Sequence, residues 1–187
     1  MLIRHIKTAT VLTAVAILLW QGWGQGQSSS ELMGQGKRAT QKISLSAGIH
    51  VFHMRHDGAE NFSIRPFGTD GRTYVSLVNT IGQFDGSAVF ATEKESTYIL
   101  NVDANGRWWI SIEGPKKIPS KREFRGHGQQ ATEMISLERG LYVFEMKHNG
   151  TGNFSVRPFN ASGRSFPSLA NEIGPFDGSA AASLAEG

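Results

Sequence analysis

Three histidines lie three residues apart, at His50, His53 and His56, and imidazole is the commonest protein ligand for metal ions. On a helix their side chains would converge, but on a β-strand His53 points away from the other two. A zinc site needs three or four convergent ligands, so this spacing argues against zinc. Only His56 recurs, 92 residues later at His148, and both precede an Asx-Gly turn. His56 and His148 are therefore candidate ligand-binding residues, with hydrogen bonding to the turn as the structural alternative.

Carboxylate and amide side chains near the expected turns form a second candidate set, because calcium is bound by oxygen ligands. Asp and Asn also dominate turns for local hydrogen-bonding reasons. Within the set, Asp85 alone recurs as a carboxylate, at Asp177. The alternatives are therefore a calcium ion or no cofactor. The predicted calcium ligands are Asp57, Asn61, Asp85, Asn153 and Asp177.

Aromatic and basic side chains form a third set. Trp108 and Trp109 are adjacent, so on a strand one indole enters the core and the other faces solvent or a neighbour. An exposed Trp109 can stack on a sugar ring, although core or interdomain packing is the commoner use of so large an apolar group. Arg65 recurs as Arg157, and both are candidates for binding anionic groups or for protecting a sheet edge.

Catalytic motifs are missing from the sequence. It has no His-Glu-x-x-His, no Gly-x-Ser-x-Gly, no recurring pair of carboxylates and no cysteine. The sequence therefore predicts a protein that is not an enzyme. The formal net charge of +3 is too small to indicate nucleic acid as a partner.

An internal repeat positions these residues. Residues 36–88 align without a gap to residues 128–180, and 30 of the 53 positions are identical. The offset of 92 residues is close to the size of one small β-sandwich. The chain has 22 glycines and no sustained helical period after its first segment, which indicates an all-β fold.

Short strands with alternating apolar residues are expected along each copy. Phe52 and Met54 recur and should face the core, and Asn105-Gly106 should join a closing hairpin of alternating apolar residues. The strand that contains Pro66 should lie at a sheet edge or end in a bulge, because proline has no N–H to donate. Residues 74–78 should form a further strand, and residues 79–87 a structured loop.

The predicted fold is two tandem antiparallel, jelly-roll-like β-sandwich modules after an N-terminal signal or anchor helix. An apolar run of 12 residues, 9–20, follows a basic start, as in a signal peptide. The second copy is expected to be incomplete, because it has no equivalent of residues 96–113. The predicted domains are a signal peptide or anchor (1–26), a linker (27–35), repeat 1 (36–113), a basic linker (114–127) and repeat 2 (128–187).

Several short motifs resemble a known family of secreted bacterial domains. They are Leu45-x-x-Gly48-x-x-x-Phe52, His56-Asp57-Gly58, Asn61-Phe62, and Tyr98-x-Leu100-x-Val102-x-Ala104 before Trp108. Together they resemble pre-peptidase C-terminal domains, and the resemblance implies a β-sandwich that acts as a non-catalytic accessory or surface domain. The chain has Asn-Phe-Ser-Ile-Arg at 61–65 where typical members carry Asp-x-Asp-Leu. That departure weakens any transfer of metal-binding residues.

The sequence thus predicts an exported, non-catalytic binding or accessory protein of the bacterial cell envelope, secreted or periplasmic. Its expected ligand is a polysaccharide or another protein, and its only membrane contact is the N-terminal segment. The alternative is a structural assembly protein. In that case the incomplete second copy would be completed by strand exchange with another chain, and a homo-oligomer would be expected.

Overall fold

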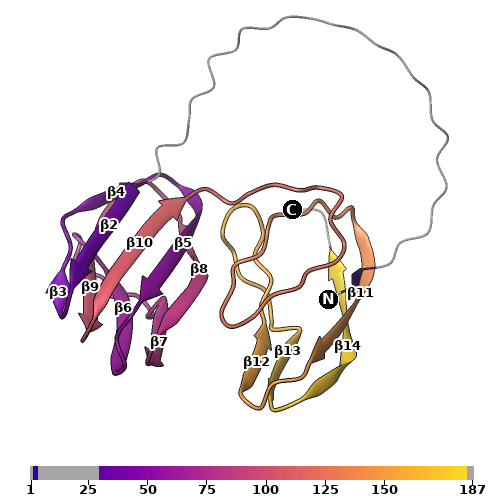
Figure 1. The fold of residues 1–187 in the computed structure, drawn as a ribbon. Helices are drawn as coiled ribbons and strands as arrows, with labels where there is room; N and C mark the ends of the chain where they lie inside the picture. The colour runs from indigo at the N-terminus through magenta and orange to yellow at the C-terminus, as the bar shows by residue number, and fades with distance from the viewer. Residues whose placement is uncertain (1, 4–29, 185–187) are drawn as a thin grey trace, which may run out of the picture.

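The computed structural model describes residues 2–3 and 30–184, and every regular element in them is a β-strand. All strand-to-strand pairs are antiparallel (Figure 1). The all-β prediction is therefore confirmed. The described residues contain no helix of a length and hydropathy that would cross a bilayer. Apart from Leu2 and Ile3, the predicted signal or anchor segment lies outside the described residues.

The first unit, residues 30–113, contains two sheets. The β5 sheet has the strand order β2, β10, β5, β8. Its strands are β2 (Ser30–Gln35), β10 (Arg107–Glu113), β5 (Gly48–His56) and β8 (Phe84–Thr92). The β9 sheet has the order β3, β9, β6, β7, with β4 also paired to β9. Its strands are β3 (Arg38–Ala39), β4 (Ile43–Leu45), β6 (Asn61–Gly68), β7 (Val78–Ile81) and β9 (Ser96–Ala104).

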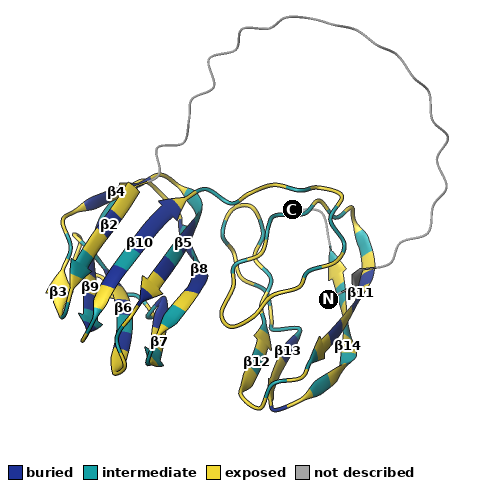
Figure 2. Ribbon diagram, in the orientation of Figure 1, coloured by how far each residue is buried: buried dark blue, intermediate teal, exposed yellow. Residues whose placement is uncertain are grey.

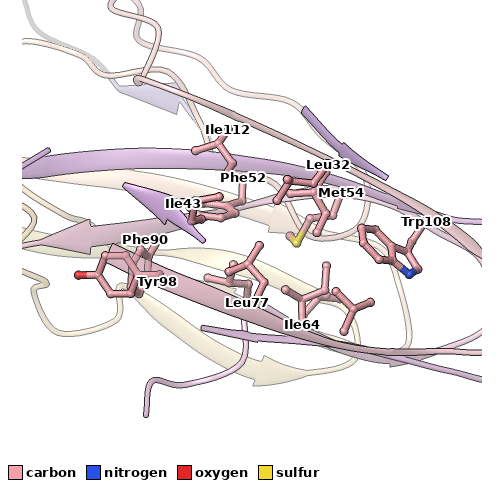
Figure 3. Packing of buried hydrophobic residues seen from close by; sticks show 14 of the residues in the cluster. Leu32, Ile43, Phe52, Met54, Ile64, Leu77, Phe90, Tyr98, Trp108 and Ile112 are labelled. Carbon is pink, nitrogen blue, oxygen red and sulfur yellow. The ribbon is translucent and has the colours of Figure 1, made fainter. Parts of the chain in front are cut away.

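Both sheets of the first unit contribute to one apolar cluster (Figure 3). Phe52 and Met54 of β5 are completely buried, as the alternation predicts. Ile64 of β6 and Leu100 of β9 are completely buried on the other sheet. Trp108 of β10 closes one end of the cluster, where its indole N–H donates to the carbonyl of Gly36 at 3.1 Å. One hydrophobic core therefore holds the two sheets together.

In the second unit, residues 128–184, three strands have the bounds of β5, β7 and β8 shifted by 92, and a fourth matches the first half of β6. Its strands are β11 (Gly140–His148), β12 (Asn153–Val156), β13 (Ala170–Ile173) and β14 (Phe176–Leu184). β11 pairs with β14 and β12 with β13, as β5 pairs with β8 and β6 with β7. A short strand, β1 (Leu2–Ile3), also pairs with β11. The turn glycines Gly71 and Gly163 have φ of 84° and 86°, a left-handed conformation that favours glycine.

The second unit is less completely buried than the first (Figure 2). Among residues 128–184 there is no strand equivalent to β9 or β10. Phe154 and Val156 are half-buried, whereas their equivalents Phe62 and Ile64 are completely buried. β14 has no buried residue, although its equivalent β8 has four. The buried core of the second unit is correspondingly small, and consists of Tyr142, Phe144, Met146 and Ala170.

Three strand predictions are wrong. Residues 27–35 are not all linker, because β2 pairs with β10 and Leu32 reaches the core. Residues 74–77 are not in a strand. Residues 79–87, predicted as a loop, belong mostly to β7 and β8. For β2, β7 and β8, pairing with a strand elsewhere in the chain decides the structure, and the local sequence carries little sign of that pairing.

Pro66 does not lie on an edge strand, because β6 runs between β9 and β7. β7 pairs only with residues 61–64 of β6, so it has ended before Pro66. The carbonyl of Pro66 accepts from Tyr74 N–H on that side, at 3.2 Å. The carbonyl and the nitrogen of one strand residue point the same way, so the missing N–H faces this loop and not β9. The ladder to β9 therefore loses no hydrogen bond at the proline.

The segment that begins the second unit runs along the outer edge of β8. Ser87 N–H donates to the carbonyl of Gln129 at 3.0 Å, and Ser87 Oγ accepts from Ala131 N–H at 2.8 Å. The Gln129 amide donates to the carbonyl of Leu77 at 2.7 Å. These bonds cover part of an edge that would otherwise present unpaired backbone groups.

Truncation of a core residue in one unit should lower the stability of that unit and leave the stability of the other unchanged. In a Trp20→Phe, Trp23→Phe background the remaining tryptophans, Trp108 and Trp109, report on the first unit. Phe52→Ala should lower the stability seen by their fluorescence in urea by about 3–5 kcal/mol, because it empties a completely buried site. The matched change Phe144→Ala should leave that transition within about 0.5 kcal/mol. Equal shifts for both variants would contradict two separate cores.

Candidate functional site

The outer face of the β5 sheet carries a row of side chains that crosses all four strands. Trp109 of β10 is in register with Met33 of β2 on one side and with Arg55 of β5 on the other. Arg55 is in turn in register with Asp85 of β8. Trp108 and Met54, the neighbours of Trp109 and Arg55 along their strands, are buried, so the row points away from the core. We call Met33, Trp109, Arg55 and Asp85 the Trp109 row.

Contacts within the row fix its central residues. The Arg55 guanidinium carbon lies 5.5 Å from the centroid of the Trp109 ring, in a cation–π arrangement. Arg55 Nε is 3.3 Å from Asp85 Oδ2. Met33 is 70% exposed beside the half-buried indole. The row therefore combines an apolar platform with charged groups of both signs.

A groove of about 900 Å³ runs along this face and includes the whole row. Its other side is lined by Gln35 of β2 and Arg107 of β10, and by Asp57 and Gln83, which lie just beyond the ends of β5 and β8. Asp57 accepts at Oδ1 from Arg107 N–H and at Oδ2 from Arg107 Nε, both at 2.7 Å. The side-chain bond from Arg107, followed by its backbone bond, lowers the pKa of Asp57 below the usual value of 3.8.

The chemistry available in the groove is recognition by stacking and hydrogen bonding. A carboxyl that acts as a general acid near neutral pH needs a raised pKa, and the pKa of Asp57 is lowered. Both carboxylates of the groove are paired with arginines: Asp57 with Arg107 and Asp85 with Arg55. The geometry therefore favours binding of a neutral or weakly charged polar molecule with an apolar face.

The structure buries His56 and gives it a structural role. Its side chain stacks on Phe62, with 4.6 Å between ring centroids, and the residue is only 4% exposed. His56 Nδ1–H donates to the carbonyl of Gly82 at 2.9 Å, and Nε2 accepts from Gly106 N–H at 3.2 Å. The two bonds fix the neutral tautomer that carries its proton on Nδ1. His56 thus ties two turns together, as the structural alternative in the sequence suggested.

His148 occupies the same place in the second unit. Its ring stacks on Phe154, with 4.9 Å between centroids. Its Nε2 atom is buried and has no hydrogen-bond partner. The donor used in the first unit, Gly106 N–H, has no equivalent among the described residues of the second unit.

Arg65 and Arg157 lie outside the groove. Arg65 belongs to β6 in the β9 sheet, where its Nε donates to Ser76 Oγ at 3.3 Å. Arg157 makes the same bond to Ser168 Oγ, at 3.4 Å. In each unit the arginine fastens the loop that follows the strand.

The five predicted calcium ligands do not gather into one cluster. Asp57 pairs with Arg107, Asp85 with Arg55 and Asp177 with Lys147, the last at 2.8 Å. Asn61 and Asn153 begin β6 and β12 and are exposed. In the part of the chain that the structure describes, no three His, Asp or Glu residues are close enough to share a metal ion. His53, from the histidine series, binds Glu113 across the sheet at 2.8 Å.

The sequence predicted Trp109 as a stacking residue and Asp57 and Asp85 as calcium ligands, and it singled out neither Met33 nor Arg55. Met33 lies in the segment predicted as a linker. Its strand, β2, has only one buried residue and no alternation of apolar residues, so no strand signal appears in the sequence there. Arg55 follows Met54 on a strand whose inner face was predicted, so its outward direction could have been inferred. Its position beside Trp109 depends on the register of β10 against β5, which the sequence does not show.

Comparisons of the chain with protein-family models, curated proteins and solved structures found no match.

Removal of His56 should destabilise the first unit. His56→Ala loses two hydrogen bonds and a buried ring stack, and should lower the free energy of unfolding by about 2–4 kcal/mol. His53→Ala, on the opposite face of the same strand, loses only an exposed hydrogen bond to Glu113 and should cost under about 1 kcal/mol. Urea unfolding followed by tryptophan fluorescence measures both. Comparable losses would contradict the assignment of His56 as a tie between turns.

The Asp57–Arg107 pair should be sensitive to acid. Since folding lowers the pKa of Asp57, its stabilisation is present above the unfolded pKa and is lost as the pH falls through the lowered value. Carboxyl ¹³C NMR titration should place the midpoint of Asp57 below 3.8. Arg107→Ala should raise that midpoint towards 3.8, whereas Arg65→Ala should not move it. A midpoint at or above 3.8 in the unmodified protein would contradict the pairing.

Proposed function

We propose that this chain is a non-catalytic binding protein whose ligand is a polysaccharide held on the outer face of the β5 sheet. The observation that carries the proposal is the Trp109 row, aligned across four strands in a groove of about 900 Å³. Sheets supply a rigid support for such a row, because the backbone of each strand is fixed by its neighbours.

A sugar ring has one apolar face and a rim of hydroxyl groups. The indole of Trp109 and the exposed side chain of Met33 offer an apolar surface of matching kind. Arg55 and Asp85 stand beside the indole, where hydroxyl groups can donate to the carboxylate and accept from the guanidinium. An open groove that crosses the whole sheet suits a polymer better than a small, enclosed ligand.

Binding is favoured over hydrolysis by the electrostatics of the groove. A glycosidase of the usual type keeps one carboxyl protonated near neutral pH by raising its pKa. The hydrogen bonds from Arg107 instead lower the pKa of Asp57. Arg55 Nε lies 3.3 Å from Asp85 Oδ2, so this carboxylate is held in an ion pair.

The wider proposal is an exported accessory protein of the bacterial envelope, secreted or periplasmic, built from two β-sandwich modules. The support for export is the basic and then apolar pattern of residues 1–26. The support for the modules is the common core of the two sheets in the first unit and the recurring strand pairs in the second. A surface groove on a rigid domain is what such an accessory role requires.

Substitution of Trp109 should weaken glycan binding. The full chain is screened on a glycan array, and the affinity for the best-bound glycan is then measured by calorimetry. Trp109→Ala should weaken binding at least tenfold, about 1.4 kcal/mol, because it removes the stacking surface. Trp109→Phe should retain part of the affinity, since a smaller aromatic face remains.

The matched control is Arg65→Ala, on the β9 sheet away from the groove, which should leave the affinity unchanged. Unfolding in urea confirms that each variant is folded at the assay temperature. Binding that survives Trp109→Ala, or that Arg65→Ala abolishes instead, would place the ligand elsewhere. Failure of the unmodified chain to bind any glycan would overturn the proposal.

A further inference from the structure

Arg38 lies at one end of the groove that contains the Trp109 row. It is exposed, and it forms neither an ion pair nor a side-chain hydrogen bond with any described residue. The other two arginines of the groove, Arg55 and Arg107, are paired with Asp85 and Asp57. One of the three guanidinium groups that line the groove therefore remains free to bind an anion.

The strand register directs Arg38 towards the groove from the opposite sheet. Arg38 begins β3 and is in register with Val102 of β9, which is completely buried. Residues opposite each other on paired strands project from the same face of a sheet, so Arg38 leaves the β9 sheet on the side of the core. β3 and β2 lie at the ends of the two sheets. The guanidinium therefore emerges between the edges of the two sheets, at the β2 end of the groove.

A smaller hollow of about 310 Å³ adjoins the groove at this point. Met33 and Arg38 line both spaces, and Glu31 lines only the smaller one. A ligand that lies on Trp109 and continues past β2 therefore passes Arg38. The apolar platform and the free guanidinium belong to one continuous surface.

The distribution of charge along the groove favours a single anionic group. Three arginines and two aspartates line it, which gives a net charge of +1. In the strand order β2, β10, β5, β8, Asp85 belongs to β8 and Asp57 follows β5, so both lie away from the β2 end. A polymer with a charge on every unit would meet these carboxylates. One acidic group at the β2 end avoids both aspartates and meets Arg38.

Protection of the sheet edge is the other use of an inward-facing charge at this place. Such a charge discourages pairing of the edge with another chain. That role requires no contact with a ligand. It predicts that the loss of Arg38 leaves glycan binding unchanged, so a binding measurement separates the two roles.

We infer that the ligand of the groove is an acidic glycan, in which Arg38 binds a carboxylate or sulfate group of one sugar while Trp109 stacks on a neighbouring sugar. This inference rests on the glycan-binding function proposed for the groove. A guanidinium donates parallel N–H groups to the oxygens of an anion, and these charge-assisted bonds are stronger than bonds between neutral groups. The acidic group thus fixes the direction in which the glycan lies across the sheet.

Matched neutral and acidic glycans test the inference on the full chain. An array presents neutral glycans beside counterparts that carry a uronate carboxylate in one arm and a sulfate ester in the other. Calorimetry on the best-bound pair should show that the acidic member binds about fivefold more tightly than the neutral member. The arm that contains this pair identifies the source of the charge.

Three variants assign the preference to the groove. Arg38→Gln should remove the preference for the acidic member and leave the affinity for the neutral member unchanged. Lys37→Gln removes the neighbouring cation, which pairs with Asp103 outside the groove, and should leave the preference intact. Trp109→Ala should weaken both members of the pair by a similar factor, because both stack on the indole.

Two results would overturn the inference and leave the proposed function in place. One is equal or tighter binding of the neutral glycans, still weakened by Trp109→Ala. The other is an acidic preference that survives Arg38→Gln or that Lys37→Gln removes equally, which would assign it to the general surface charge. Failure of every glycan to bind would instead overturn the proposed function, and the inference with it.

Discussion

The closing hairpin β9–β10 is the element on which the first unit depends. Its two strands enter different sheets, so the hairpin binds the sheets to each other as well as filling the core between them. Its turn is tied to the turn after β5 by several bonds, among them Gly106 N–H to His56 Nε2 and Arg107 N–H to Asp57 Oδ1. A Cβ at Gly106 would lie 2.5 Å from Gly58 N, so only glycine allows the two turns to approach this closely.

The second unit shows what the other strands do without that hairpin. The inward residues of β11 remain buried, because β14 and the opposite pair of strands still cover them. The neighbouring strands are less buried than their equivalents, and the His148 imidazole keeps its stack on Phe154 while its Nε2 has no hydrogen-bond partner. The strand pairs β11–β14 and β12–β13 thus form, whereas the described residues of the second unit contain no hairpin that joins the two pairs. The contrast separates the contribution of the hairpin from that of the strands it joins.

Those features that depend on local sequence could be predicted. The alternation of Phe52 and Met54 identified a core-facing strand, and Asn105-Gly106 identified a hairpin, because both signals lie within a few residues. Features that depend on pairing with a strand far away in the sequence could not be predicted. β2 contains one buried residue, so only its position beside β10 makes it a strand. The Trp109 row likewise requires three registers that connect residues far apart in the chain.

The proposed glycan site uses the outer face of the β5 sheet. The outer face of a complete sheet presents side chains at fixed spacings, and its backbone groups are already paired. It can therefore recognise a ligand only by what those side chains offer, which at Trp109 is an aromatic surface between Met33 and Arg55.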